Sequence, residues 1–149
     1  EDKIMSALSN YSEKALLDHL LGTATFTKPS AVYVALFTAS DSTGDTLENL
    51  EQGILTNEVA GNGYSRQTAS FNAVTLGAGS TTNSGNITFT ASGGAFGTIV
   101  AVAIMDTDST SDSAGAGNVL AYGSLTAEKT IADGDSFQIS TGNLTITLA

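Results

Sequence analysis

The chain of 149 residues contains no cysteine and no tryptophan, and only one proline. Without cysteine it has no disulfide framework and no cysteine-type zinc site. No apolar run is long enough to span a bilayer, because the best one, residues 97–105, has the length of a strand. The first residues lack the apolar core of a signal peptide. With 41% hydrophobic residues, we expect a single domain over residues 1–149 rather than a disordered chain.

Positive charge is also scarce, with five Lys and Arg against fifteen Asp and Glu and a net charge of −10. Binding to a phosphate backbone needs a basic surface. We therefore expect no nucleic acid and no anionic membrane surface among the direct partners. Solubility is one sufficient explanation of the acidity.

The sequence also lacks catalytic motifs. Its single histidine, His19, lies in a helical segment, and neither a second histidine nor a nucleophile elbow supports a role as a base. The glycine pairs at 61–63 and 115–117 are not followed by the third glycine of a nucleotide-binding turn. We expect a protein that is not an enzyme and needs no cofactor. A depolymerase ranks lowest among the functions considered, because length, repeats and a convincing carboxylate pair are missing.

One acidic loop is a candidate metal site. Asp106, Asp108 and Asp112 are close together in sequence, and calcium prefers carboxylate oxygens. The spacing fails the EF-hand pattern, because Ser111 occupies the glycine position and no glutamate closes the loop. A solvated loop is the preferred interpretation, with calcium binding as the alternative.

Residues 9–22 form the clearest helix signal. Ser9 or Asn10 can cap its start, and Gly22 stands where a left-handed residue ends a helix. Its apolar stripe consists of Leu16, Leu17, Leu20 and Leu21. We expect these leucines to be interface residues that cover an open face or edge of the sheet, or that cross to a neighbouring subunit. Residues 1–8 are expected to be an N-terminal arm.

Most of the remaining chain is predicted to be β. The segment 31–38 has apolar residues on both faces, and the still more apolar 97–106 is expected to be central. The long acidic stretch 39–57 is expected to be a loop, although 46–52 is compatible with a short helix. Further strands are expected within 61–74, 86–91, 118–125, 128–134 and 136–149. The fold prediction for 31–149 is an antiparallel β-sandwich or jelly-roll-like domain of about seven or eight strands.

Tyr64 and Arg66 lie together in a strand-like segment. Arg66 is the only arginine of this acidic chain. Arginine in such a setting anchors an interface or pairs with an internal carboxylate, and the sequence leaves both roles open. We include Tyr64 and Arg66 among the candidate interface residues.

Several stretches together resemble a family of small virion structural proteins of tailed phages. The most specific are Leu-Ser-Asn-Tyr at 8–11, Tyr-Val-Ala-Leu-Phe-Thr at 33–38, Gly-Tyr-Ser-Arg-Gln at 63–67 and Gly-Asp at 134–135. The resemblance extends from residue 8 to 148. The sequence departs from the family pattern at 41–57 and 106–112, where a specialised contact could lie.

This resemblance implies a non-enzymatic protein on the surface of a phage particle. The first hypothesis is a capsid decoration or cement protein that binds the major capsid protein or another virion protein, as a homo-oligomer with a trimer favoured. The alternative is a tail or tail-fibre module, either an adaptor or a host-receptor-binding tip. The chain has no tryptophan and few aromatic residues outside expected strands, which weighs against a glycan-binding tip.

Overall fold

The most apolar segments of the chain pair with each other inside a seven-stranded sheet. These are β2 (Val32–Phe37) and β6 (Gly97–Met105), which run antiparallel. All residues in 34–37 and 101–105 are buried, as expected for strands covered on both faces. The computed structural model describes residues 4–39, 46–111 and 115–148.

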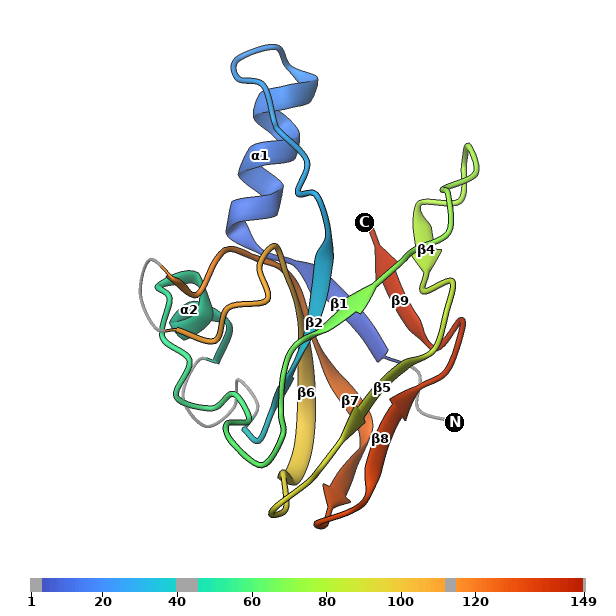
Figure 1. Cartoon of the computed structure of the whole chain (residues 1–149). Coiled ribbons are helices and arrows are strands. Elements are labelled where there is room, and N and C mark those ends of the chain that lie inside the picture. Colours follow the sequence, from blue (N-terminus) through green and yellow to red (C-terminus); the bar gives the residue numbers. More distant parts are fainter. Residues whose placement is uncertain (1–3, 40–45, 112–114, 149) are drawn as a thin grey trace.

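The large sheet has the strand order β3-β2-β6-β7-β1-β9-β4, and β5 and β8 form a second, two-stranded sheet (Figure 1). All pairs are antiparallel except the parallel pair of β1 and β9. The other bounds are β1 Ile4–Leu8, α1 Asn10–Leu20, α2 Thr46–Glu51, β3 Gln67–Ala69, β4 Ser80–Thr82, β5 Ile87–Thr90, β7 Val119–Ile131, β8 Ser136–Ile139 and β9 Leu144–Thr147.

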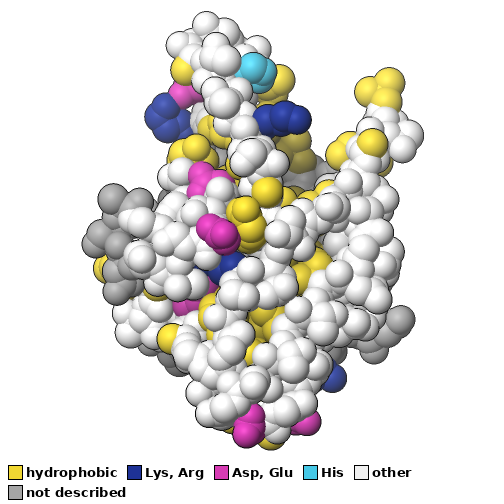
Figure 2. Space-filling model, viewed as in Figure 1, with side chains coloured by type: hydrophobic (Ala, Val, Ile, Leu, Met, Phe, Trp, Pro, Cys, Tyr) yellow, Lys and Arg dark blue, Asp and Glu magenta, His cyan; other side chains and the backbone are white. Residues whose placement is uncertain are grey.

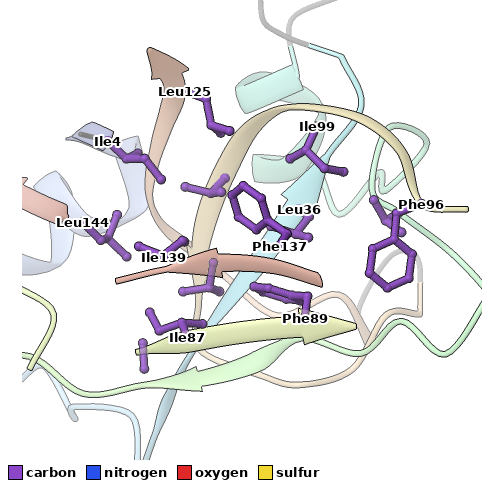
Figure 3. Packing of buried hydrophobic residues seen from close by; sticks show 14 of the residues in the cluster. Ile4, Leu36, Ile87, Phe89, Phe96, Ile99, Leu125, Phe137, Ile139 and Leu144 are labelled. Atoms are coloured by element: carbon purple, nitrogen blue, oxygen red, sulfur yellow. The ribbon is translucent and has the colours of Figure 1, made fainter. Parts of the chain in front are cut away.

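The main core lies between the two sheets. Strands β5 and β8 alternate strictly, so that their apolar side chains face the large sheet while threonine, serine and glutamine face water. Phe89 and Phe137 face each other across the two strands, with ring centroids 6.2 Å apart. Around them lie buried side chains of the large sheet, among them Ile4, Leu36, Ile99, Leu125 and Leu144 (Figure 3).

A second core covers the opposite face of β2 and β6. Leu50 of α2 and Ala116 of the loop before β7 pack there against Phe37, Met105 and Tyr122. The rings of Phe37 and Tyr122 meet edge to face at 6.1 Å. The large sheet is therefore covered by a second sheet on one face and by α2 and a loop on the other.

The structure confirms the predicted mainly β sandwich with an N-terminal helix, and it confirms the central position of β6. One expectation was wrong: Ile4–Leu8, expected within an arm, is strand β1, which pairs with β7 and with β9. Two expected strands over 118–134 are the single strand β7. Within the loop expected at 39–57, residues 46–51 form α2.

Asn83 organises the turn between β4 and β5. Its side chain is fully buried. The amide nitrogen donates to the carbonyls of Gly85 and Ser140 at 2.8 and 3.0 Å, and the amide oxygen accepts the N–H of Leu144 at 2.9 Å. One side chain thus joins the entry of β5 to the turn between β8 and β9.

A buried ion pair holds the loops at one end of the large sheet. Arg66 donates from Nε and Nη2 to the two carboxylate oxygens of Glu58, each at 2.8 Å. Its Nη1 donates to the carbonyls of Thr107 and Ala116, each at 3.0 Å. The side chains of Arg66 and Glu58 are 0% and 3% exposed, so the pair is bidentate and desolvated. The structure thus gives Arg66 the second of the two roles expected for it.

Tyr64 completes this network. Its hydroxyl donates to Glu58 Oε1 at 2.8 Å and accepts the N–H of Leu36 at 3.0 Å. Burial, together with the nearby Glu58 carboxylate, raises the pKa of the Tyr64 hydroxyl above its usual range. The folded protein therefore holds this proton more firmly than the unfolded chain does.

We predict that Arg66→Met lowers the free energy of unfolding by about 3–5 kcal/mol, because it leaves the Glu58 carboxylate buried without its partner. Lys14→Met is the matched control. It breaks the pair of Lys14 with Asp18 on the surface of α1, where Lys14 is 78% exposed, and is expected to cost less than about 1 kcal/mol. Urea unfolding measures both. Equal losses in the two variants would contradict the role given to Arg66.

We predict that Asn83→Ala lowers the free energy of unfolding by about 2–4 kcal/mol, because the buried N–H of Leu144 and the part-buried carbonyls of Gly85 and Ser140 lose their partner. Asn72 provides the control, since its side chain also bonds the backbone, at the Thr82 carbonyl, but is exposed to water. Asn72→Ala should cost less than about 1 kcal/mol in the same urea titration. A loss for Asn83→Ala no larger than for Asn72→Ala would refute this account.

Stability should also decline at alkaline pH. The raised pKa of Tyr64 contributes stability that is fully present below the unfolded tyrosine pKa of about 10 and is lost as the pH rises above it. We expect Tyr64→Phe to have a lower free energy of unfolding than wild type at about pH 8. Between about pH 8 and about pH 11, however, its free energy of unfolding should fall by less than that of wild type. Tyr11→Phe, on the exposed surface of α1, should follow wild type. If Tyr64→Phe lost as much stability at alkaline pH as wild type does, the role given to the Tyr64 hydroxyl would be contradicted.

Candidate functional site

Helix α1 is fixed firmly at its base. Ser9 is fully buried as the N-cap, where its hydroxyl accepts the N–H of Ser12 and donates to the carbonyl of Val119. The backbone N–H and the side-chain amide of Asn10 donate to the two carboxylate oxygens of Glu51, at 2.7 and 2.8 Å. These contacts orient the helix relative to β7 and α2.

Beyond its base, α1 projects away from the sheets (Figure 1). None of its residues is buried. Leu16 is half-buried, whereas Leu17, Leu20 and Leu21 are 57%, 68% and 75% exposed. The expectation that these leucines cover a face or edge of the sheet within the chain was therefore wrong. The alternative, that they contact a neighbouring subunit, stays a prediction.

The far end of α1 is also ordered by side-chain contacts. Gly22 has the positive φ, +73°, expected where a helix ends. Lys14 and Thr23 donate hydrogen bonds to the Asp18 carboxylate, and these bonds lower the pKa of that group. His19 accepts the N–H of Phe26 at Nδ1, at 3.2 Å. His19 thus stabilises the turn that leads from α1 back toward β2.

Beside α1 lies an apolar groove of about 460 Å³. Its lining consists of Leu8, Glu13, Leu16, Leu17, Leu20, Thr147 and Leu148. A second hollow of about 190 Å³ shares Leu8, Thr147 and Leu148 with it, and extends to Val74 and β4. We call the two hollows together the α1 groove. Its floor is formed by the ends of β1 and β9, and among the lining residues that the structure describes Glu13 is the only charged one.

The wall of the α1 groove opposite the helix is the projecting loop of residues 72–80. A bond from the N–H of Ala78 to the carbonyl of Thr75 closes its turn, and the N–H of Leu148 donates to the Gly79 carbonyl. Val74 is 60% exposed and Leu76 is wholly exposed. Figure 2 shows apolar side chains along the inner side of the helical projection and at the tip of this second projection. Sequence reasoning missed this wall, because its small residues and two glycines are typical of an ordinary linker.

The other sequence-predicted sites lie elsewhere. Tyr64 and Arg66 lie in the buried network with Glu58 rather than at the surface. Asp106 accepts hydrogen bonds from the backbone and side chain of Asn118, each at 2.7 Å, so its carboxylate shapes the loop before β7. Asp108 is exposed, and Asp112 lies outside the described residues. Within the described ranges, no group of three or more acidic or histidine side chains could share a metal ion.

The structure therefore offers a surface suited to contact with another macromolecule. An open groove lined by leucines between two projections is typical of a protein-protein interface. No helix in the described parts of the chain is both long and apolar enough to cross a membrane.

Comparison with known proteins agrees with a structural role. No curated protein sequence matches the chain. The family model described as Podophage GP4 fiber I protein gp80 matches residues 7–147, which is nearly the whole chain. The chain therefore belongs to this family of phage fibre proteins and is a structural component of the virion.

Proposed function

We propose that the chain is a non-enzymatic module of a phage fibre, held in the particle by protein-protein contacts through the α1 groove. The observation that carries this proposal is the α1 groove itself, an open apolar surface between two projections in a chain that belongs to a fibre family. Interfaces of stable assemblies have apolar centres of this kind. The rigid base of α1 would reduce the entropy lost on docking.

The family description supports the tail-fibre alternative better than capsid decoration. Within that alternative, an adaptor is favoured over a receptor-binding tip. Tyr11, 38% exposed, is the one aromatic residue among the large apolar side chains exposed in the described ranges. Receptor and glycan sites commonly use exposed aromatic rings. The exposed apolar surface is instead mainly leucine, which suits packing between protein subunits.

The number and position of copies in the particle test this proposal. We expect quantitative mass spectrometry of purified virions, with isotope-labelled peptides as standards, to find roughly a few to a few tens of copies per particle. Labelling with an antibody fragment should place them on a fibre. Hundreds of copies, in proportion to the major capsid protein and spread over the shell, would refute the fibre module and favour decoration.

A further inference from the structure

Side-chain hydrogen bonds hold three turns together at one end of the sandwich. The turn between β5 and β6 and the turn between β7 and β8 lie at this end, opposite α1 (Figure 1). The Asp133 carboxylate of the second turn accepts the N–H groups of Gly93 and Gly94 in the first, at 2.9 and 3.1 Å. The third turn consists of residues 61–64 and is joined to the β5–β6 turn by Asn62.

Asn62 contacts the β5–β6 turn through both its main chain and its side chain. Its carbonyl accepts the N–H of Ser92 at 2.9 Å, and its Nδ2 donates to the carbonyl of Ala95 at 2.7 Å. The packing is close, because a Cβ added to Gly94 would lie 2.6 Å from the Asn62 side-chain oxygen. Asn62 is nevertheless exposed to water. An exposed side chain therefore carries much of the contact between these two turns.

The 61–64 turn depends on its Asn-Gly sequence. The N–H of Tyr64 donates to the carbonyl of Gly61 at 2.8 Å, and the two central residues, Asn62 and Gly63, have φ angles of +53° and +76°. Asparagine and glycine adopt such angles more readily than other residues. Of the nine asparagines in the sequence, Asn62 is the only one followed by glycine.

We propose that Asn62 is a site of spontaneous deamidation in the folded protein, with water as the co-reactant. The main-chain nitrogen of Gly63 attacks Asn62 Cγ. A bond forms between these two atoms, the Cγ–Nδ2 bond breaks, and ammonia leaves with the proton of the Gly63 N–H. Water then opens the cyclic imide at either of its carbonyls, which gives aspartate or isoaspartate. Glycine favours the first step, because it has no side chain to hinder its nitrogen.

The position of Asn62 on the surface gives it an advantage over the other asparagines. Cyclisation requires Asn62 to rotate out of its hydrogen bonds, so the rate follows local opening of the 61–64 turn. Such opening exposes no core side chain at Asn62 itself, since this residue is already exposed. By contrast, Asn83 is fully buried. Asn72 is exposed, but the methyl group of Ala73 hinders attack by the following nitrogen.

Deamidation would turn an attractive contact into a repulsive one. An aspartate at this position cannot donate to the Ala95 carbonyl, so two acceptor oxygens would face each other. The new carboxylate would also lie beside Gly94, whose N–H already binds the Asp133 carboxylate, and like charges repel. Isoaspartate additionally lengthens the main chain inside the turn that the Tyr64 N–H closes. We therefore expect the modification to loosen the 61–64 and β5–β6 turns.

Peptide mapping by mass spectrometry tests the reaction. The purified wild-type chain is incubated in mildly alkaline buffer, and aspartate and isoaspartate are quantified at every asparagine over time. We expect Asn62 to react about tenfold faster than Asn72 or any other asparagine, because only Asn62 precedes glycine. Incubation in urea should accelerate the reaction at Asn62 further, because the turn is then open. Isoaspartate among the products would support the cyclic imide as the intermediate.

Two variants test the effect of the modification on the turns. Asn62→Asp imitates the aspartate product, and Asn72→Asp is the matched control. Asn72 is also an exposed asparagine whose amide donates to a backbone carbonyl, that of Thr82, and both variants add one negative charge. We expect amide hydrogen exchange at Ser92 and Tyr64 to be about tenfold faster in Asn62→Asp than in the control. The urea midpoint of Asn62→Asp should also be the lower of the two.

Two results would overturn this inference. One is a native chain in which Asn62 stays intact while another asparagine has reacted. The other is amide exchange at Ser92 and Tyr64 that is no faster in Asn62→Asp than in Asn72→Asp. Neither result bears on the fibre module, which copy number in the particle tests separately.

Discussion

The burial of β2 and β6 on both faces is the constraint from which the rest of the fold follows. A central strand pair with no face toward water needs two covers. The sheet of β5 and β8 provides one with a strictly alternating pattern, which places its phenylalanines inward. The other cover is made of α2 and the loop before β7, whose buried carbonyls need donors. Arg66 supplies them to Thr107 and Ala116, and the buried guanidinium in turn requires Glu58 and, through Glu58, Tyr64. A charged network is thus the consequence of covering an apolar sheet with irregular chain.

The position of β1 determines what α1 can reach. Because β1 lies between β7 and β9, the helix that begins immediately after it leaves from the end of an interior strand and not from the edge strands β3 and β4. Ser9 is tied to Val119, which fixes the direction of departure. The leucine stripe therefore faces the α1 groove at the end of the sheet and not a sheet face. An amphipathic helix is commonly taken to cover the nearest sheet, but here the strand before it makes that geometry unavailable.

The parts of the structure that could be predicted from sequence carry local signals. Apolar residues on both faces of 32–37 and 97–105 indicate buried strands, and Ser9 and Gly22 delimit the helix through their capping chemistry. The missed elements lack such signals. Strand β1 is five residues long and β4 is Ser-Thr-Thr, a sequence typical of loops, and both exist because of pairing with the distant β9. The α1 groove could not be predicted from sequence for the same reason. Its two walls are separated by about fifty residues of sequence and are joined by the ends of β1 and β9.

The distribution of charge gives the strongest physical reason to regard the α1 groove as an assembly surface. Natural sheets protect their edge strands from pairing with other chains by placing charged residues on them. Strand β4 is an edge strand beside the groove, yet it lies within residues 67–105, which carry no charge at all. Acidic side chains lie on the helices, on β7 as Glu128, and on two loops, one with Asp108 and the other with Asp133 and Asp135. Net charge spread in this way disfavours random association of copies, while Glu13 is the one charged residue among the described lining residues of the α1 groove. The α1 groove, which we propose as an assembly surface, thus lies beside an uncharged edge strand and the exposed leucines.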